Sequence, residues 1–156
     1  MITCAGLAIG ARLPALRIPV SAKTIVMGAA ASRDWQPQHH DSAWARQGAG
    51  LPDIIMNNYT QAGFLSRYLT DWSGPHGRIG RLKLRMRRPV CPGAEMVIEG
   101  VVEAMLATVN GFSWVDLSLS LTVEGEIATA AEARLALPAN AQSPSPWRCP
   151  RALWAP

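Results

Sequence analysis

The sequence predicts an α+β domain in which one long amphipathic helix is followed by a sheet of antiparallel strands. Three observations support this prediction. Apolar residues recur with helical spacing between residues 53 and 71, four long segments after residue 77 alternate apolar and polar residues, and turn-forming residues separate these segments. One helix followed by a meander of long strands is typical of a sheet that packs around that helix.

The composition sets the scale of the domain. A chain of 156 residues fits one domain and can bury a substantial core. Because 49% of the residues are hydrophobic and only 17% are charged, we expect part of the surface to be buried in an oligomer. We assign residues 1–11 to a loose lead-in and 12–138 to the domain. Residues 139–156, rich in Ala, Ser and Pro, are expected to be poorly ordered or to dock on a partner.

The first elements are predicted to be short. Residues 13–20 contain two prolines, which cannot donate hydrogen bonds inside a sheet, so this segment is expected to be an edge strand. Ser21 is a suitable cap for a helix over residues 22–31. Asp41 is expected to cap a second short helix, which ends at Gln47.

The longest helix is predicted over residues 53–71. One face carries apolar residues three or four positions apart: Ile55, Tyr59, Ala62, Leu65 and Leu69. Asn57 and Asn58 are also plausible caps, so the position of the first turn stays open.

Four strands are predicted after this helix, over residues 78–88, 95–107, 112–124 and 127–137. In the third strand, apolar and polar residues alternate without interruption from Val115 to Glu124. Asn110-Gly111 and Glu124-Gly125-Glu126 are typical hairpin turns between strands.

The segment that follows the first short helix contains candidate catalytic residues. Asp34 and His39 lie five residues apart, with Pro37 between them. Because Pro37 fixes its own φ and makes Gln36 extended, we expect the segment to curve so that both side chains face one volume. A carboxylate beside an imidazole commonly binds and activates water. From the spacing alone, a solvated surface loop is the more common outcome.

This segment resembles the hydratase motif of MaoC-like, R-specific enoyl-CoA hydratases. Asp34, Pro37 and His39 match the motif, and Ala45 falls on its closing small position. Three positions depart from it: Arg33, Gln36 and Gln38 replace a Gly, an Asn and an aliphatic residue.

The similarity extends over about residues 12–137. Segments 53–57, 69–75 and 88–93 resemble one branch of the family in particular. That branch consists of small, single-hotdog subunits of heteromeric hydratases, which act on CoA thioesters of steroid side chains.

The resemblance implies a hotdog fold, in which an antiparallel sheet wraps around one long central helix. It implies hydration of a 2-enoyl-CoA to a 3-hydroxyacyl-CoA with no metal and no cofactor, since CoA is part of the substrate. Asp34 and His39 would activate water and transfer the proton, and which of them is the base stays open. The backbone N–H of Asn57 would stabilise the thioester oxyanion, although Asn57 is equally suited to a simple capping role.

A row of basic residues is predicted on the first strand of the sheet. Arg81, Lys83, Arg85 and Arg87 alternate with apolar residues, which places them on one face. We assign Arg81, Lys83 and Arg85 to the binding of the CoA phosphates; a solvated face or a protected sheet edge is the alternative. The net charge of +4 also fits nucleic acid, but the interleaved aromatic residues of a base-stacking surface are missing.

The resemblance also implies a partner, because the CoA tunnel of this family forms between two hotdogs and this chain has one. The partner would be a second copy or a different subunit. Two other hypotheses stay open: a non-catalytic hotdog that supports a partner hydratase, and a hotdog acyl-CoA thioesterase.

The expected location is the cytoplasm. Three widely spaced cysteines predict reduced thiols, and no basic residue precedes the apolar residues 2–10, so a secretory signal is not expected. No apolar run approaches the roughly 20 residues of a membrane-spanning helix, so no membrane insertion is expected.

Overall fold

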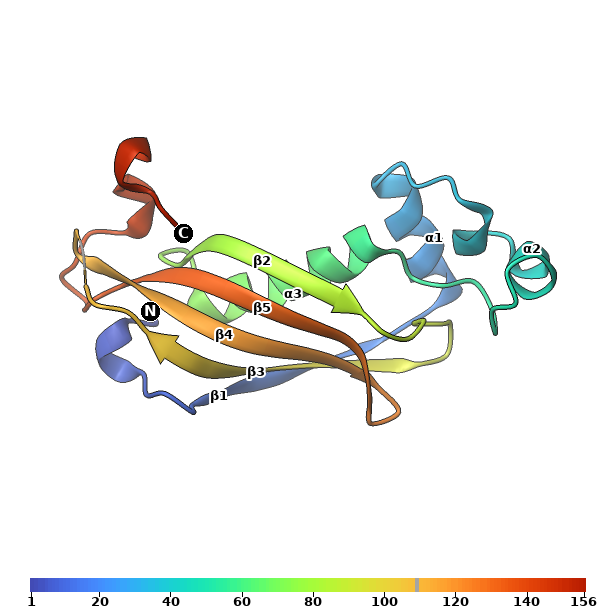
Figure 1. Cartoon of the computed structure of the whole chain (residues 1–156), viewed down its shortest axis with the longest axis horizontal. Helices are drawn as coiled ribbons and strands as arrows, with labels where there is room; N and C mark the ends of the chain where they lie inside the picture. The colour runs from blue at the N-terminus through green and yellow to red at the C-terminus, as the bar shows by residue number, and fades with distance from the viewer. Residues whose placement is uncertain (109) are drawn as a thin grey trace.

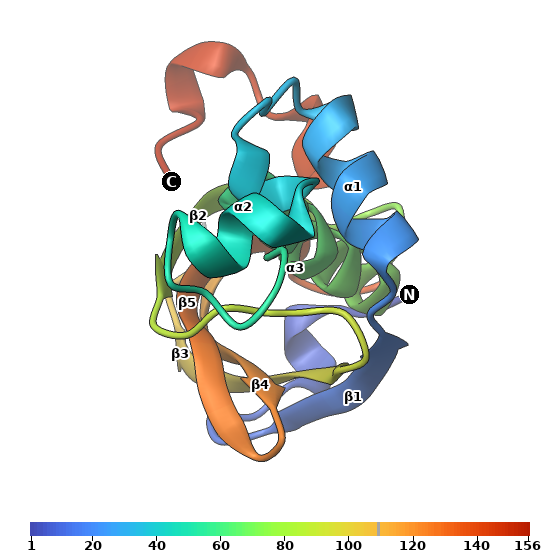
Figure 2. The ribbon, with the colours of Figure 1, turned by 90° about the vertical axis from the view of Figure 1, so that its right-hand side faces the viewer.

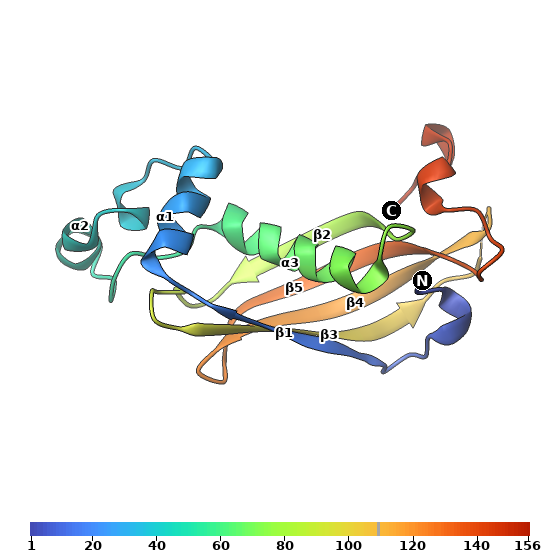
Figure 3. The same cartoon turned by 180° about the vertical axis from the view of Figure 1, so that it is seen from behind.

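The computed structural model describes residues 1–108 and 110–156, and its centre is one antiparallel sheet beside one long helix. The strands are ordered β1–β3–β4–β5–β2. They comprise β1 (Arg12–Pro19), β2 (Arg78–Met86), β3 (Glu95–Met105), β4 (Phe112–Val123) and β5 (Glu126–Pro138). Helix α3 (Asn58–Ser73) lies along one face of the sheet (Figures 1 and 3), and the sheet curves around this helix when viewed end-on (Figure 2). The predicted α+β hotdog arrangement is confirmed.

The core lies between α3 and the inner face of the sheet. The alternation predicted for the third strand is confirmed in β4, where Val115, Leu117, Leu119 and Leu121 are buried and the residues between them are partly exposed. Leu65 of α3 is completely buried against this layer. The strand boundaries lie within two residues of the predicted ones because hairpin turns end the strands.

The long helix begins later than predicted. Residues 53–57 are not helical, and the Asn57 side chain accepts a hydrogen bond from the Thr60 backbone N–H at 2.9 Å, which starts α3 at Asn58. The predicted apolar face was therefore wrong in part: Ile55 lies outside the helix, and Tyr59 is 62% exposed. The face that the sheet covers consists of Gln61, Leu65, Tyr68, Leu69 and Ser73.

Helices α1 (Ala22–Ala31) and α2 (Ser42–Gln47) lie together at one end of the sheet, beyond the first turn of α3 (Figure 1). Both caps that the sequence predicts are present. The Ser21 side chain accepts from the Thr24 N–H at 3.1 Å, and the Asp41 carboxylate accepts from the Trp44 N–H at 2.9 Å. The segment between these two helices forms one wall of the site described below.

The C-terminal segment 139–156 lies at the opposite end of the sheet (Figure 1). The Trp154 ring packs against Trp114 with a centroid separation of 4.6 Å, and the Arg78 guanidinium lies 3.6 Å from the Trp154 ring centroid. The Trp147 indole donates to the Gly77 carbonyl at 3.0 Å. The segment is thus anchored to its own sheet by aromatic and cation–π contacts.

No helix in residues 1–108 or 110–156 is both long enough and apolar enough to cross a membrane.

An ion pair on the outer face of the sheet should make stability depend on pH. Arg134 donates two hydrogen bonds to Asp116, at 2.6 and 2.7 Å, and these bonds hold the pKa of Asp116 below its usual range. Because the folded-state pKa is depressed, the pair stabilises the fold above the usual carboxyl pKa of about 4, and this contribution is lost as the pH falls through the folded-state pKa. The pair is partly exposed, so we expect about 0.5–1 kcal/mol.

Asp116→Asn should therefore lower the free energy of unfolding in urea by about that amount near pH 7 and by almost nothing near pH 2. An equal loss at both pH values would show that the carboxylate charge of Asp116 does not stabilise the fold.

Candidate functional site

The end of α1 fixes the position of Asp34. Arg33 has a φ of 55°, in the left-handed region, and its N–H donates to the Ala30 carbonyl at 3.1 Å. The Asp34 N–H donates to the Ala29 carbonyl at 2.9 Å, which completes a Schellman-type helix end. The left-handed φ explains why a Gly would suit position 33. The backbone of Asp34 is thus held by carbonyls of α1.

A short 3-10 turn, η2 (Pro37–His39), positions His39. Gln36 is extended before Pro37, with a ψ of 131°, as the sequence predicts. The His39 Nδ1 lies 2.7 Å from the Ile55 carbonyl oxygen. Since a carbonyl oxygen only accepts, Nδ1 carries a proton, and Nε2 is the nitrogen that faces Asp34. The Ile55 N–H donates in return to the Gln38 carbonyl at 2.9 Å, so two hydrogen bonds join the two segments.

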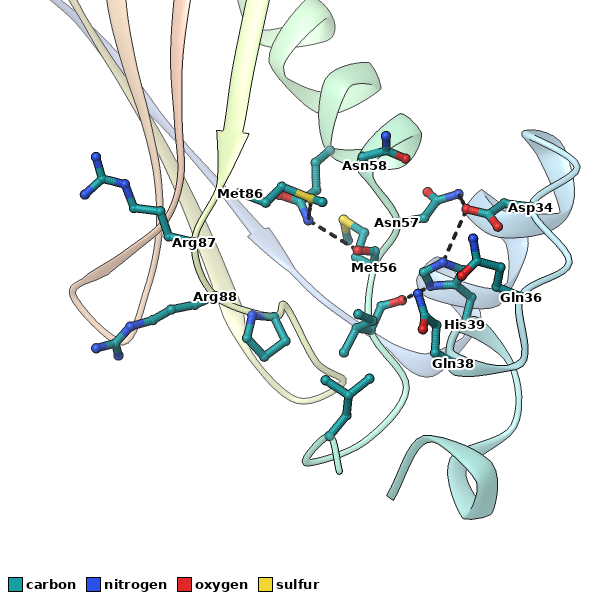
Figure 4. Close-up of a pocket in the computed structure, with 14 residues that line it drawn as sticks. Asp34, Gln36, Gln38, His39, Met56, Asn57, Asn58, Met86, Arg87 and Arg88 are labelled. Carbon is teal, nitrogen blue, oxygen red and sulfur yellow. Dashed lines mark hydrogen bonds and ion pairs between the residues drawn. The ribbon is translucent and has the colours of Figure 1, made fainter. Parts of the chain in front are cut away.

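Asp34 and His39 meet within one cavity. The Asp34 Oδ2 lies 3.2 Å from the His39 Nε2, and the two side chains are only 13% and 4% exposed (Figure 4). The cavity has a volume of about 440 Å³ and also borders Asn57, Gln61 and Met86. This volume lies in the range of small-molecule sites, and the paired carboxylate and imidazole can bind a water molecule between them and a substrate.

Asn57 connects α1 to α3 through its side-chain amide. The amide oxygen accepts from the N–H and the hydroxyl of Thr60, at 2.9 and 2.6 Å, and the amide nitrogen donates to Asp34 Oδ2 at 3.0 Å and to the Ser32 hydroxyl at 2.8 Å. Asn57 is therefore both the helix cap and a direct neighbour of the Asp34 carboxylate (Figure 4). Among the described residues, no partner accepts a hydrogen bond from the backbone N–H of Asn57.

The predicted basic row lies elsewhere. Arg81, Lys83 and Arg85 are exposed on the outer face of β2, and Arg81 faces Asp116 rather than the cavity. The reason is the strand period, which turns the alternate residues Leu82 and Leu84 toward the core. The structure therefore does not bring the assigned basic residues to the site.

Two other arginines border the cavity instead. Arg87 and Arg88 follow the end of β2, on the opposite side of the cavity from Asp34 (Figure 4), and both are exposed. Arg88 lies 3.5 Å from the Glu126 carboxylate. Arg87 continues the alternation of the basic row in the sequence, but only the end of the strand at Met86 places it beside the cavity.

Gln61 was not identified from the sequence. It lies in the covered face of α3 and borders the cavity together with Met56 and Met86. Its sequence signal is a polar residue four positions before the buried Leu65, on a helix face that is otherwise mostly apolar.

Within residues 1–108 and 110–156, no group of three or more His, Cys, Asp or Glu side chains is arranged to hold a metal ion.

The hotdog architecture and the cavity beside α3 define the class of the protein. The family described as MaoC like domain matches residues 7–113, and this chain belongs to that family.

Mycobacterium tuberculosis provides both a similar sequence and a similar solved structure. The beta subunit of 3-oxo-4,17-pregnadiene-20-carboxyl-CoA hydratase is 37% identical over 97 residues, which cover 62% of this chain and 74% of that subunit. A chain in the crystal structure of the ChsH1-ChsH2 complex has a TM-score of 0.74 and 29% identity, over 83% of this chain and 98% of that chain.

The R-hydratase PhaJ1 of Pseudomonas aeruginosa has the same fold. Its TM-score is 0.78 at 22% identity, over 89% of this chain and 87% of that chain.

Proposed function

We propose that this chain catalyses the hydration of a 2-enoyl-CoA thioester to a 3-hydroxyacyl-CoA. The observation that carries the proposal is the contact of 3.2 Å between Asp34 Oδ2 and His39 Nε2, inside a cavity that also borders the start of α3. Membership of the MaoC-like family supports the same reaction class. The reaction needs no metal, and CoA enters as part of the substrate.

The reaction adds the elements of water across the C2–C3 double bond. Water loses a proton as its oxygen bonds to C3, and a proton is added to C2, so that no net proton is gained or lost. Asp34 and His39 face the same space and together bind the water, remove its proton and return a proton to C2. The hydrogen bond between Nδ1 and the Ile55 carbonyl keeps the imidazole oriented with Nε2 toward the water.

Negative charge develops on the thioester oxygen as water attacks C3. The backbone N–H of Asn57 lies at the first turn of α3, where the helix dipole favours an anion. Its lack of a partner among the described residues leaves it available to the oxyanion. In this mechanism the Asn57 side chain caps the helix while its backbone N–H binds the substrate.

The substrate is proposed from the relatives and from the charge at the cavity. The mycobacterial relative is named for a steroid carboxyl-CoA, and we propose a steroid or fatty-acid side-chain enoyl-CoA for this chain. Arg87 and Arg88 at the rim of the cavity replace Arg81, Lys83 and Arg85 as our candidates for binding the CoA phosphates.

A partner subunit belongs to the proposal. The similar chain in the ChsH1-ChsH2 complex is part of a heteromeric assembly, and we propose that a second hotdog subunit completes the CoA site here. The cysteines of this chain, Cys4, Cys91 and Cys149, are free thiols. Because reduced thiols are typical of the cytoplasm, we propose a cytoplasmic location.

The proposed function is tested with crotonyl-CoA and with 3-oxo-4,17-pregnadiene-20-carboxyl-CoA, using the purified assembly that contains this chain. We expect the ultraviolet absorbance of the enoyl thioester to fall while no free thiol is released. Release of thiol from a saturated acyl-CoA would instead identify a thioesterase. Hydration by the assembly that survives Asp34→Asn and His39→Ala unchanged would indicate a supporting subunit, and absence of hydration with both substrates would contradict the proposal.

A further inference from the structure

We propose that Gln61 and Thr129 are positioning residues, which orient and strengthen the Asn57 N–H as the donor to the thioester oxyanion. This inference rests on the proposed hydration and deepens it, because it assigns a role to two buried polar residues that the mechanism above does not use.

The two residues form a chain of hydrogen bonds from β5 to the start of α3. The Thr129 hydroxyl donates to the Gln61 Oε1 at 2.5 Å, and the Gln61 Nε2 donates to the Met56 carbonyl oxygen at 3.2 Å. The Met56 carbonyl and the Asn57 N–H belong to the same planar peptide group. Any interaction that fixes the carbonyl therefore also fixes the direction of the N–H.

The orientation of the Gln61 amide is determined by its neighbours. A carbonyl oxygen cannot donate, so the Met56 side must receive the amide nitrogen, and the Thr129 hydroxyl then supplies the donor for the amide oxygen. The Gln61 Nε2 also lies 3.4 Å from the sulfur of Met86, and both residues border the cavity. With these partners, the amide has one arrangement that satisfies all of its contacts.

The burial of this pair argues for a role beyond packing. Gln61 is 1% exposed and Thr129 is 0% exposed, and most of the residues buried with them are apolar. Polar side chains are costly to bury unless they are hydrogen-bonded, and apolar side chains of similar volume would fill this space without that cost. What the polar pair adds is a fixed direction for the Met56–Asn57 peptide group.

The hydrogen bonds of Thr129 and Gln61 also strengthen the Asn57 N–H as a hydrogen-bond donor. A hydrogen bond to the carbonyl of a peptide group polarises that group and makes its N–H a better donor, and successive bonds reinforce one another. The benefit is largest where negative charge develops on the substrate oxygen in the transition state. Loss of Gln61 should therefore lower kcat much more than it changes KM.

The test compares variants of the complete assembly on 3-oxo-4,17-pregnadiene-20-carboxyl-CoA. We expect Gln61→Leu to lower kcat for hydration by about 10- to 100-fold with KM changed by less than about threefold. Thr129→Val should lower kcat by about three- to tenfold, and Thr129→Ser, which restores the hydroxyl, should recover most of this loss. Gln142→Leu is the matched control, because Gln142 is exposed in the C-terminal segment, and we expect it to leave kcat unchanged.

Circular dichroism and the melting temperature show which variants are folded. A folded Gln61→Leu protein with normal kcat, or a Thr129→Ser protein as impaired as Thr129→Val, would overturn the inference. If Gln61→Leu does not fold, the inference is tested by comparing the kcat of Thr129→Val with that of Thr129→Ser. Asp34→Asn, measured in parallel, distinguishes failure of this inference from failure of the proposed function. If it is inactive while Gln61→Leu keeps full kcat, only the inference fails, whereas normal hydration by Asp34→Asn overturns the proposed function itself.

Discussion

Asp34→Asn should lower kcat/KM for hydration by about 10²- to 10⁴-fold, the range that a positioned acid–base group contributes. The substitution keeps the size of the side chain but removes the carboxylate that faces His39 Nε2 at 3.2 Å. The fold should be unaffected, since α1 holds residue 34 through backbone bonds. The measurement is the decay of enoyl-thioester absorbance in the complete assembly.

The matched control is Asp41→Asn. Asp41 is exposed and caps α2 by accepting from the Trp44 N–H, a role that Asn fills equally well. We expect this variant to retain both activity and stability. A similar loss in both variants would mean that general charge, and not the Asp34 site, accounts for the effect.

His39→Ala should cause a loss of the same order, because it removes the imidazole that shares the cavity with Asp34. The neighbouring His40 is exposed, so His40→Ala is the control and should hydrate normally. Retained activity in His39→Ala would place the proton transfer on other residues.

Leu65→Ala should lower the free energy of unfolding by about 2–5 kcal/mol, the cost of emptying a buried leucine site. Leu65 is 0% exposed and lies in the core between α3 and the sheet. The neighbouring strands are held by their own ladders and cannot collapse fully into the space. The loss is measured by urea unfolding at one protein concentration, because association with a partner also contributes to stability.

The control for this change is Leu106→Ala. Leu106 follows β3 and is 39% exposed, so the same substitution should cost less than about 0.5 kcal/mol. Equal effects at the two positions would contradict a core formed by α3 and the inner face of the sheet.

The local parts of the fold are predictable from the sequence because they depend on local rules. The caps of Ser21 and Asp41 and the alternation along β4 follow from side-chain chemistry and from the strand period. The start of α3 was less predictable. Whether Asn57 or Asp53 begins the helix depends on tertiary hydrogen bonds, since the Asn57 amide is held by Ser32 and Asp34 from another segment.

Only the part of the candidate site that lies within one segment of the chain was predictable from the sequence. Asp34 and His39 are brought together by Pro37 and by the end of α1, both of which leave a pattern in the sequence. Gln61 and Thr129 are 68 positions apart and meet only because the sheet wraps around α3. The basic row of β2 was predictable to the same extent. Its alternation predicts correctly that the basic residues share one face of the strand, but whether that face borders the cavity depends on how β2 packs in the sheet.

The most direct test of the central claim is the hydration rate of the double variant Asp34→Asn/His39→Ala in the complete assembly. Residues that act on one water as a unit lose nearly all of their joint effect when either is removed. We therefore expect the double variant to be about as slow as the slower of the two single variants. Losses that multiply would show that the two side chains act independently, and a double variant as fast as the unmodified protein would show that hydration occurs outside this cavity.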